Sequence, residues 1–413
     1  MNHRRSYPVG SRTTRMRQGF RENVRLDEAV EEFLPLFGAV GSEVVCLDEA
    51  LGRVTASGVE ADRPVPGYDR AAMDGYALRA EDTHGASGAS PAVFGVVDRE
   101  GAVGEGEAAH VHTGSAVPEG ADAVVRVEET EEVGGRVEVS ARVSEGENVA
   151  YTGEDVEEGE AVVGEGERLH PSTVGVLRSV GVGEVEVRRK PRVAVVPTGD
   201  EVVESDPGPG EVVGTNGPMV AEYAERWGGE ASVRDVVPDD EDALRDSLRD
   251  AAGDADMVVT TGGSSVGERD LLPDIVDAAG DVLVHGVAVK PGHPVGFGVV
   301  NSTPVVMLPG YPVSCVVTAF EFVRRGVRAS LGAEHRAEPK SRCSLEEKIP
   351  SEVGARTYTR VEIDKDGRTA HPVRTKGASV LSSVSRADGF VVTPERREGH
   401  AAGEEVDVHL WEA

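Results

Sequence analysis

The sequence predicts a multidomain fold of mixed class: a central α/β domain with a mostly parallel sheet, β-rich domains, and a C-terminal β-barrel. Strand-like and helix-like segments alternate between residues 191 and 332, which is typical of βαβ units. Short Val-rich runs between Gly, Pro and acidic clusters fill residues 51–144, and short alternating strands return in residues 333–413. With 413 residues the chain has room for several domains of ordinary size.

The N-terminal region predicts a tail followed by a helix. Residues 1–20 carry five arginines, no acid and no apolar periodicity, which indicates a disordered tail or a true start at Met16. Apolar residues at helical spacing, with acids on the other face, then predict an amphipathic helix: Leu26, Ala29, Val30, Phe33, Leu34 and Phe37. The Gly-rich acidic stretch at 145–167 is typical of turns between short strands, and a short helix is expected at 171–181.

The alternating region predicts four strands and four helices. The strands are expected at 192–196, 232–237, 256–261 and 305–308, and the helices at 218–227, 241–252, 271–279 and 313–331. Parallel strands of such a sheet end at one edge, which is where α/β proteins bind ligands. The strands of the C-terminal barrel are expected at 357–363, 390–393 and 405–410.

The composition argues against several function classes. Lys and Arg number 43 and Asp and Glu 74, so the formal net charge is −31, and the basic patches that bind nucleic acid or anionic membranes are not expected. No segment approaches the roughly 20 apolar residues that span a bilayer, and no apolar run follows the N-terminal arginines. Cys46, Cys315 and Cys343 form no CxxC pair, so neither disulfides nor a cysteine zinc site is expected, and a reducing cytoplasm is the expected location.

The acidity also predicts a halophilic protein. Only six of the 43 basic residues are lysines, and the acids are spread along the whole chain rather than gathered in one tail. Such a surface suits a salt-rich cytoplasm, where salt screens the repulsion between carboxylates. Lowering the salt from molar concentration to about 0.1 M is therefore expected to lower the Tm. Thermal unfolding at the two salt concentrations measures this, and an unchanged Tm would refute the halophilic interpretation.

Polar loops follow three predicted strand ends, at 197–201, 262–270 and 309–314. Two common nucleotide motifs are absent, since the chain has no Gly-Lys dipeptide and no GxGxxG after a strand. Gly262 and Gly263 let backbone N–H groups approach an oxyanion, and Pro312 suits the first turn of a helix, whose free N–H groups attract anions. One such loop could be a simple turn, but three at successive strand ends predict an anion-binding site.

Charged residues accompany these loops. Three carboxylates follow predicted strand ends: Glu201, Asp239 and Asp270. They could hold a divalent cation such as Mg²⁺ beside a phosphate-type ligand, although a chain with 74 acids also exposes carboxylates by chance. Lys290 begins a loop that Pro291 and Pro294 make stiff. It is either a fixed cation for a polyanionic ligand or a surface charge. His110 and His112 could lie on one strand face, but without a third ligand a structural role is the preferred interpretation.

Residues 64–78, with the sequence PVPGYDRAAMDGYAL, resemble the signature of the molybdopterin molybdenumtransferase family, which includes MoeA and the gephyrin E domain. Further motifs follow in the order of that family. They are Thr113-Gly114, 118–125, Gly153-Glu154-Asp155, 191–201, 262–270, Lys290-Pro291-Gly292 and 308–314. The resemblance thus covers most of the chain.

The resemblance implies four domains and a homodimer. A composite domain I would contain residues 21–50 and 145–190, and a β-rich domain II residues 51–144. An α/β domain III of residues 191–332, similar to the MogA-like molybdopterin adenylyltransferases, would bind molybdopterin, and residues 333–413 would form β-barrel domain IV. The active cleft would lie between domain III of one subunit and domain II of its partner.

The implied reaction is insertion of molybdate or tungstate into adenylylated molybdopterin, with Mg²⁺-assisted release of AMP. The implied catalytic residues are Asp74, Glu201, Asp239 and Asp270, and the last three would also bind Mg²⁺. The implied ligand-binding residues are Thr113, Asp155, Thr198, Gly199, Gly262, Gly263, Ser264, Lys290, His293, Pro309, Gly310, Pro312 and Ser314. A molybdopterin adenylyltransferase and apo-molybdoenzymes are the implied protein partners.

Two departures from the family pattern lower the positive charge near the ligand. His293 stands where many members have a second lysine, and Ala150-Tyr151-Thr152 replaces a run that is often basic. A catalytically silent molybdopterin carrier or scaffold is one alternative, because the gephyrin branch also acts in anchoring; the complete set of motif acids argues against it. A molybdopterin adenylyltransferase or a pyrophosphatase on the same α/β fold is another, but such an enzyme would not need the additional region at 51–190.

Overall fold

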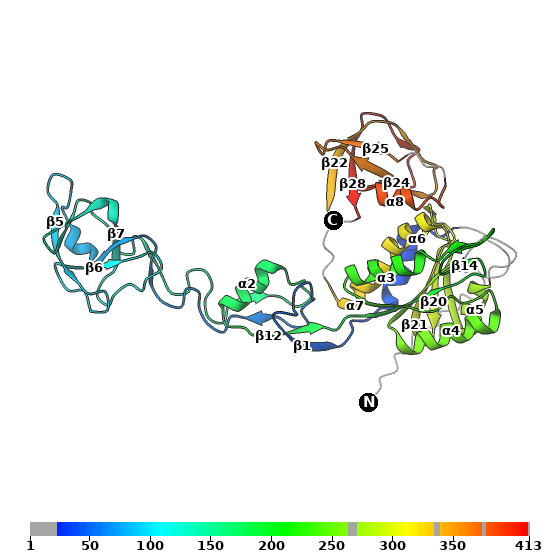
Figure 1. Cartoon of the computed structure of the whole chain (residues 1–413), viewed down its shortest axis with the longest axis horizontal. Coiled ribbons are helices and arrows are strands. Elements are labelled where there is room, and N and C mark those ends of the chain that lie inside the picture. The colour runs from blue at the N-terminus through cyan, green and yellow to red at the C-terminus, as the bar shows by residue number, and fades with distance from the viewer. Residues whose placement is uncertain (1–22, 263–270, 334–338, 374–376, 412–413) are drawn as a thin grey trace. The chain divides into compact units, whose positions relative to one another are not determined.

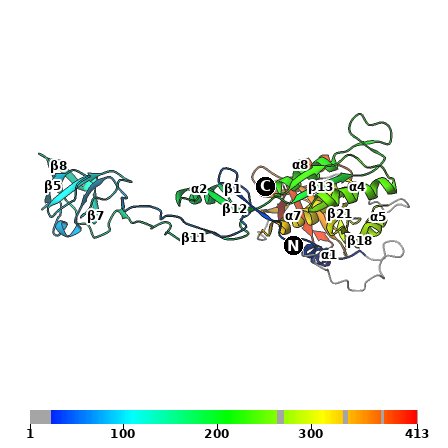
Figure 2. The same ribbon diagram turned by 90° about the horizontal axis from the view of Figure 1, so that it is seen from below.

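The computed structural model describes residues 23–262, 271–333, 339–373 and 377–411. They form two units (Figures 1 and 2): a middle unit of residues 42–187, and a terminal unit made of the described parts of residues 1–41 and 188–413. The predicted tail at 1–20 and the predicted site residues Gly263, Ser264 and Asp270 lie outside the described residues.

The middle unit contains three clusters of buried apolar residues, two of them large. In the first, segments far apart in sequence pair: β1 (Ser42–Cys46) with β12 (Glu184–Arg188), and β2 (Val59–Glu60) with β11 (Ala161–Val163). Helix α2 (Pro171–Ser179) buries Leu177 in this core. A bridging pair, β3 (Arg70–Ala71) with β10 (Val149–Ala150), connects it to the second core.

The second core lies in a six-stranded sheet of order β7-β4-β6-β5-β9-β8. Its strands are β4 (Gly75–Leu78), β5 (Ala92–Val97), β6 (Glu107–Val111), β7 (Ala123–Arg126), β8 (Thr130–Val133) and β9 (Arg136–Val139), with 3₁₀ turns at Ala80–Thr83 and Val127–Glu129. Small aliphatic side chains fill the core around Phe94 and Leu78, as the scarcity of aromatic residues requires. The β-rich prediction for this region is therefore confirmed.

The α/β part of the terminal unit has a sheet of order β16-β13-β17-β21-β20-β18. Four strands are parallel: β16 (Glu230–Val233), β13 (Arg192–Pro197), β17 (Met257–Thr261) and β21 (Thr303–Leu308). Helices α4 (Glu241–Asp254) and α5 (Leu272–Ala279) cover one face, and α3 (Asn216–Arg226), α6 (Pro312–Thr318) and α7 (Arg324–Leu331) the other (Figure 1). Burial on both faces explains the continuous Val-rich runs.

The sheet also has two antiparallel strands that the sequence pattern did not predict. They are β18 (Gly280–His285) and β20 (Gly296–Val300). Glycines in β20 hide the apolar pattern by which a strand is predicted. Glycine is required at position 298, because a Cβ there would lie 2.4 Å from the Asp281 carbonyl oxygen of the paired strand β18. The helix expected at 313–331 is also interrupted, by a π-helical segment η4 (Ala319–Val323) between α6 and α7.

The N-terminal helix α1 (Leu26–Phe33) belongs to the terminal unit and continues as a 3₁₀ turn (Leu34–Leu36). Phe33 packs edge-on against Phe297 of β20 and Phe322 of η4, with ring centroids 5.0 and 5.3 Å apart. The amphipathic helix that the sequence predicts is therefore buried through its apolar stripe. Within the described ranges, no helix combines the length and the apolar character needed to cross a membrane.

The C-terminal part is a closed barrel, as predicted. Five strands pair in the order β24 (Arg356–Ile363), β25 (Thr369–Pro372), β22 (Lys340–Leu345), β28 (Glu405–Leu410) and β26 (Gly389–Thr393), and β26 pairs back with β24. The barrel part also contains the strand pair β23 (Ile349–Pro350) with β27 (Gly399–His400) and helix α8 (Ser382–Arg386). In the α/β part, a second small pair, β14 (Val202–Val203) with β15 (Val212–Val213), follows β13. Strand β19 (Val289–Lys290) extends the barrel beside β24.

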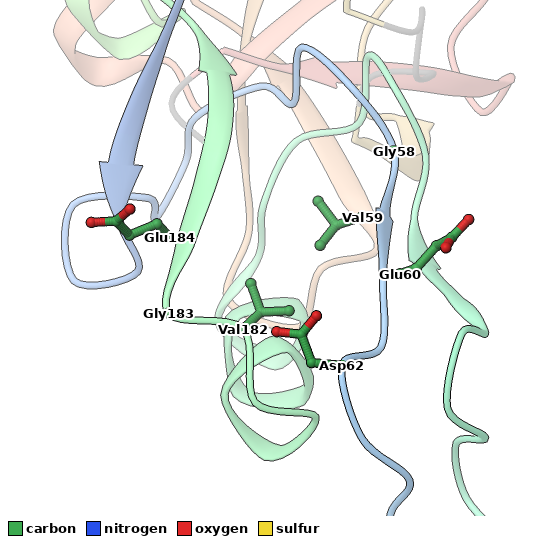
Figure 3. A pocket seen from close by; sticks show the side chains of 7 residues that line it. All are labelled: Gly58, Val59, Glu60, Asp62, Val182, Gly183 and Glu184. Carbon is green, nitrogen blue, oxygen red and sulfur yellow. The ribbon is translucent and has the colours of Figure 1, made fainter.

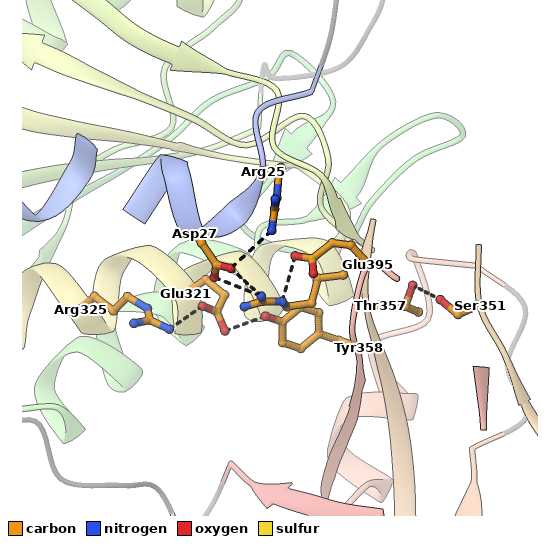
Figure 4. Close-up of polar contacts among 9 residues, drawn as sticks. Arg25, Asp27, Glu321, Arg325, Ser351, Thr357, Tyr358 and Glu395 are labelled. Atoms are coloured by element: carbon orange, nitrogen blue, oxygen red, sulfur yellow. Dashed lines mark hydrogen bonds and ion pairs between the residues drawn. The ribbon is translucent and has the colours of Figure 1, made fainter. Parts of the chain in front are cut away.

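A polar network joins the α/β part, helix α1 and the barrel (Figure 4). The Tyr358 hydroxyl of β24 donates a 2.8 Å hydrogen bond to Glu321 of η4, and Arg325 donates a 2.9 Å bond to the same carboxylate. Arg356 of β24 pairs with Asp27 of α1 at 3.0 Å. Burial and the neighbouring Glu321 carboxylate raise the pKa of Tyr358, so this hydroxyl stays protonated and can donate.

Replacing Glu321 by alanine is expected to destabilise the chain by roughly 3 kcal/mol, because the buried Tyr358 hydroxyl loses its acceptor and Arg325 its charge partner. Glu321 is only 6% exposed, so water cannot replace the lost oxygen atoms. Urea unfolding of the full chain measures the change. Glu362→Ala, an exposed acid on β24, is the control and should stay within about 0.5 kcal/mol of the original protein. Equal stabilities of the two variants would contradict the expectation.

Candidate functional site

The carboxyl ends of β13, β17 and β21 meet at one edge of the sheet. Pro197 pairs with Thr261, and Thr261 with Leu308. The next residues continue this contact, since Thr198 N–H donates to the Thr261 carbonyl at 3.1 Å and Gly262 N–H donates to the Leu308 carbonyl at 3.3 Å. The structure thus brings the starts of all three predicted loops together.

Two glycines allow this close approach. Gly262 has a φ of +115°, and a Cβ on it would lie 2.3 Å from the Thr198 carbonyl oxygen. A Cβ on Gly310 would lie 3.5 Å from the Gly262 Cα, so these loops pack backbone against backbone. Only glycine combines this φ with this contact. The Gly262 position is therefore dictated by packing. Its N–H is already bonded to the Leu308 carbonyl, so the expectation that it is a free donor for an oxyanion is wrong.

The loops after β13 and β16 bring two predicted carboxylates to this edge. The side chain of Glu201 folds over Gly199. A Cβ added to Gly199 would lie 2.7 Å from a carboxylate oxygen of Glu201. Gly199 N–H donates to the Val237 carbonyl at 3.1 Å, and Asp239 N–H donates to an Asp200 carboxylate oxygen at 3.1 Å. Glu201 and Asp239 therefore belong to adjoining loops.

A complete metal cage is not present among these groups. Within residues 23–262, 271–333, 339–373 and 377–411, no three His, Cys, Asp or Glu side chains converge closely enough to hold a metal ion. The third predicted ligand, Asp270, lies outside those residues. Two carboxylates nevertheless suit Mg²⁺, which is commonly bound by one or two carboxylates together with substrate phosphates.

Asn216, at the start of α3, is a site residue that the sequence analysis missed. Its Nδ2 donates a 2.7 Å hydrogen bond to the Gly310 carbonyl and so fastens the loop after β21. Its Oδ1 and the Oγ1 of Thr198 are buried without a hydrogen-bond partner in the described part of the chain. Such atoms are rare in folded proteins and are candidate contacts for a ligand. In the sequence, the only hint of this role was an asparagine that follows the β13 loop region, and an asparagine there looks like an ordinary helix start.

Helix α6 begins at Pro312, as its position after Pro309-Gly310 predicts. However, the backbone N–H groups of its first turn are less available to a ligand than expected. Val313 N–H donates to the Ala378 carbonyl of the barrel at 3.0 Å, and Ser314 is buried. The expectation of free N–H groups at this helix start is therefore wrong for Val313, because a loop distant in sequence occupies it.

Lys290 and His293 lie beside α6. A Cβ on Gly292 would lie 2.5 Å from a Thr318 side-chain carbon and 3.5 Å from the Ser314 carbonyl oxygen, so this loop packs directly on the helix. Burial and the positive charge of Lys290 lower the pKa of His293 below its ordinary value. His293 is thus uncharged near neutral pH, and it does not replace the second lysine as a cation.

In the middle unit, Asp74 and Thr113 are joined directly. The N–H and the hydroxyl of Thr113 donate to one Asp74 oxygen at 2.7 and 3.1 Å. These bonds, and more weakly His112 and His110, hold the pKa of Asp74 below its ordinary value. The His112 Nδ1 lies 3.8 Å from the same oxygen. Asp155 is exposed and its N–H bonds to the Val65 carbonyl at 2.9 Å, but no described contact joins its carboxylate to Asp74.

Thr113→Val is expected to raise the pKa of Asp74 towards its ordinary value, though only in part, because the backbone N–H is the stronger cause. A lowered pKa means that this carboxylate stabilises the fold above about pH 4 and that the contribution is lost as the pH falls through the lowered value. Carboxyl NMR titration measures the shift. Thr152→Val, which removes the equivalent 2.8 Å bond to Asp69, is the control and should leave Asp74 unchanged. An unshifted Asp74 in Thr113→Val would contradict the assignment.

A cleft of about 580 Å³ opens elsewhere in the middle unit (Figure 3). It is lined by Gly58, Val59, Glu60, Asp62, Val182, Gly183 and Glu184. Its three carboxylates would repel a polyanion, so this cleft does not fit the ligand that the sequence predicts. It contains none of the predicted site residues.

Three family descriptions match successive parts of the chain. The family described as "MoeA N-terminal region (domain I and II)" matches residues 24–181. The "Probable molybdopterin binding domain" matches residues 194–329, and the "MoeA C-terminal region (domain IV)" matches residues 342–411.

Individual relatives match over nearly their full lengths. A Methanocaldococcus jannaschii protein named for molybdopterin biosynthesis is 36% identical over 372 residues, which is 88% of this chain and 90% of the relative. The molybdopterin molybdenumtransferase of Staphylococcus aureus strain COL is 31% identical over 409 residues, covering 95% and 97%. The crystal structure of the molybdopterin biosynthesis MoeA protein of Pyrococcus horikoshii OT3 matches with a TM-score of 0.85 at 33% identity, covering 94% and 100%. The chain therefore belongs to the MoeA family, as residues 64–78 predict.

Proposed function

We propose that this chain is a molybdopterin molybdenumtransferase, which inserts molybdate or tungstate into adenylylated molybdopterin and releases AMP. The observation that carries this proposal is the sheet edge where three glycine-containing loops start side by side. Two buried oxygens there, Thr198 Oγ1 and Asn216 Oδ1, have no partner within the described residues. The Staphylococcus aureus relative, matched along 95% of this chain, carries that enzyme name.

The proposed reaction involves no change of oxidation state. The two dithiolene thiols bond to the metal, and their protons leave with one oxo ligand as water. A second water cleaves the phosphoanhydride and yields AMP and the pterin phosphate, so one water is formed and one is consumed. Because both reactants are anions, the site must offset negative charge while it orients that water.

The residues of the sheet edge divide these tasks. We assign Glu201 and Asp239 to hold and orient the attacking water, with Asp270 as the predicted third carboxylate. Lys290 would bind the oxyanion or phosphate. Mg²⁺, when bound by these carboxylates, would offset the phosphate charge. Thr198, Gly199, Gly263, Ser264, His293 and the loop from Pro309 to Ser314 would line the pterin and phosphate site.

The assembly is part of the proposal. We propose a cytoplasmic homodimer that works in high salt, with the four-domain division given above and with a molybdopterin adenylyltransferase and apo-molybdoenzymes as protein partners. Asp74, Thr113 and Asp155 of the middle unit would complete the cleft of the other subunit. Coexpression of Asp74→Asn with Glu201→Gln tests this. Random pairing makes half of the molecules heterodimers with one intact cleft, so about a quarter of the normal activity should return. No recovery would contradict a shared cleft.

A direct assay tests the activity. Purified full-length protein in high salt receives adenylylated molybdopterin, Mg²⁺ and either molybdate or tungstate, and AMP release and pterin-bound metal are followed. Release of AMP together with metal transfer is the expected result. Tight pterin binding without AMP release would favour a carrier or scaffold. Formation of adenylylated molybdopterin from ATP and molybdopterin would favour an adenylyltransferase instead.

A further inference from the structure

Lys290 lies at the junction of the α/β part and the barrel. Its strand β19 pairs in parallel with the barrel strand β24, with Lys290 opposite Thr357. Two residues later, Gly292 packs against α6 so closely that a Cβ would lie 2.5 Å from Thr318. The backbone of Lys290 is therefore held from both sides, and only its side chain is free to change partner.

That side chain contacts a carboxylate of the barrel, Glu352. Glu352 belongs to the loop between β23 and β24. Three hydrogen bonds anchor this loop: Ser351 Oγ to Thr357 Oγ1 at 2.7 Å, Ser351 N–H to the Glu398 carbonyl at 2.8 Å, and Gly354 N–H to the Glu395 carbonyl at 2.8 Å. The first of these is drawn in Figure 4. Because Ser351 is bonded to Thr357 of β24, the strand that pairs with β19, the neighbouring Glu352 is held close to the Lys290 ammonium.

The ion pair is open to solvent. The side chains of Lys290 and Glu352 are 43% and 78% exposed, so a dissolved anion can reach the ammonium. Lys290 donates a hydrogen bond to Glu352 and holds the pKa of this carboxyl below its ordinary value, and Glu352 is therefore ionised near neutral pH. The pair has no net charge, and exposed pairs of this kind are weak enough to exchange partners.

A second barrel contact engages the same region of α6. The Ala378 carbonyl accepts the Val313 N–H at 3.0 Å, in the loop region where the sequence predicts anion binding. Barrel groups thus contact both the Lys290 ammonium and a backbone donor at the start of α6. Both contacts join residues of the terminal unit.

We propose that Glu352 is an intramolecular competitor of the oxyanion ligand, whose carboxylate must leave the Lys290 ammonium before a molybdate or phosphate oxygen can bind there. The inference rests on the proposed function, in which Lys290 binds the oxyanion. It adds that the barrel lowers the resting affinity of the site for free anions. A ligand that makes contacts elsewhere in the site displaces Glu352, whereas a simple anion does so poorly.

A double-mutant cycle tests the competition. Molybdate binding to the full-length protein is measured by titration calorimetry at fixed salt for the original chain, Glu352→Gln, Lys290→Gln and the double variant. Glu352→Gln is expected to tighten binding about two- to fivefold, the range that exposed ion pairs provide. In the Lys290→Gln background the same change should have almost no effect. Glu362→Gln, at the far end of β24, removes an equal charge and should leave the affinity unchanged.

The outcomes separate this inference from the proposed function. If Lys290→Gln leaves molybdate binding unchanged, the oxyanion role of Lys290 fails and the competition fails with it. If Lys290→Gln weakens binding but Glu352→Gln does not tighten it, only the competition is overturned. Equal tightening by Glu352→Gln in both backgrounds would mean a general charge effect and would also overturn it. An unchanged Tm of Glu352→Gln verifies that its fold is intact.

Discussion

Glu201→Gln is expected to lower the rate of AMP release by at least about 100-fold, the size of effect typical of losing a positioned acid or base. The carboxylate folds over Gly199 at the sheet edge, and the Glu201 carbonyl accepts the Val212 N–H at 2.8 Å, which fixes the loop. Glutamine preserves the shape but removes the charge that would orient water or bind a cation. The measurement is AMP release under saturating substrate, together with the Tm.

Glu204→Gln is the matched control for this substitution. Glu204 is an exposed acid three residues further on, just after the short strand β14, and its change removes the same charge. Its rate should stay close to that of the original protein. If Glu201→Gln retained more than half of the activity, or if both variants lost activity equally, a specific role of Glu201 would be refuted.

Gly262→Ala is expected to have the largest effect on both stability and activity. Alanine would have to adopt a φ of +115° with its Cβ 2.3 Å from the Thr198 carbonyl oxygen. Strain and overlap with backbone atoms together predict a loss of roughly 2–4 kcal/mol in the free energy of unfolding. Because relief of the overlap must move β17 away from β13, turnover should also fall about 100-fold. Urea unfolding and the AMP assay measure the two effects.

The control for this prediction is Gly253→Ala in helix α4. No atom lies within 4 Å of a Cβ at Gly253, and its φ is not positive. Alanine there should be neutral or stabilising by up to about 1 kcal/mol, because it favours the helix. A Gly262→Ala protein as stable as Gly253→Ala would show that the close approach of the strand ends is not required.

Much of the fold follows from local sequence patterns. Continuous Val-rich runs predict β13, β17 and β21, and apolar residues at helical spacing predict α1 and α4, because burial of a face imposes these periods directly. Strands β18 and β20 escaped prediction. Gly298 has no side chain to show the period, and its close approach to Asp281 leaves no room for one.

The candidate site, too, could be predicted from the sequence only in part. Loops with glycine and proline directly after strands point to Thr198, Gly262 and Pro309, and the topology of a parallel sheet brings these ends together. Asn216 could not be selected from sequence, because only its bond to the Gly310 carbonyl distinguishes it from an ordinary residue at a helix start.

The sequence by itself therefore determined the α/β and β-rich character, the family and the loops that carry the candidate site. The tertiary structure decided which groups meet across long stretches of chain: Asp74 with Thr113, Val313 with Ala378, and Lys290 with Glu352. The physical reason is that periodicity and turn chemistry act between near neighbours in sequence, whereas these contacts depend on how strands and loops distant in the chain pack together.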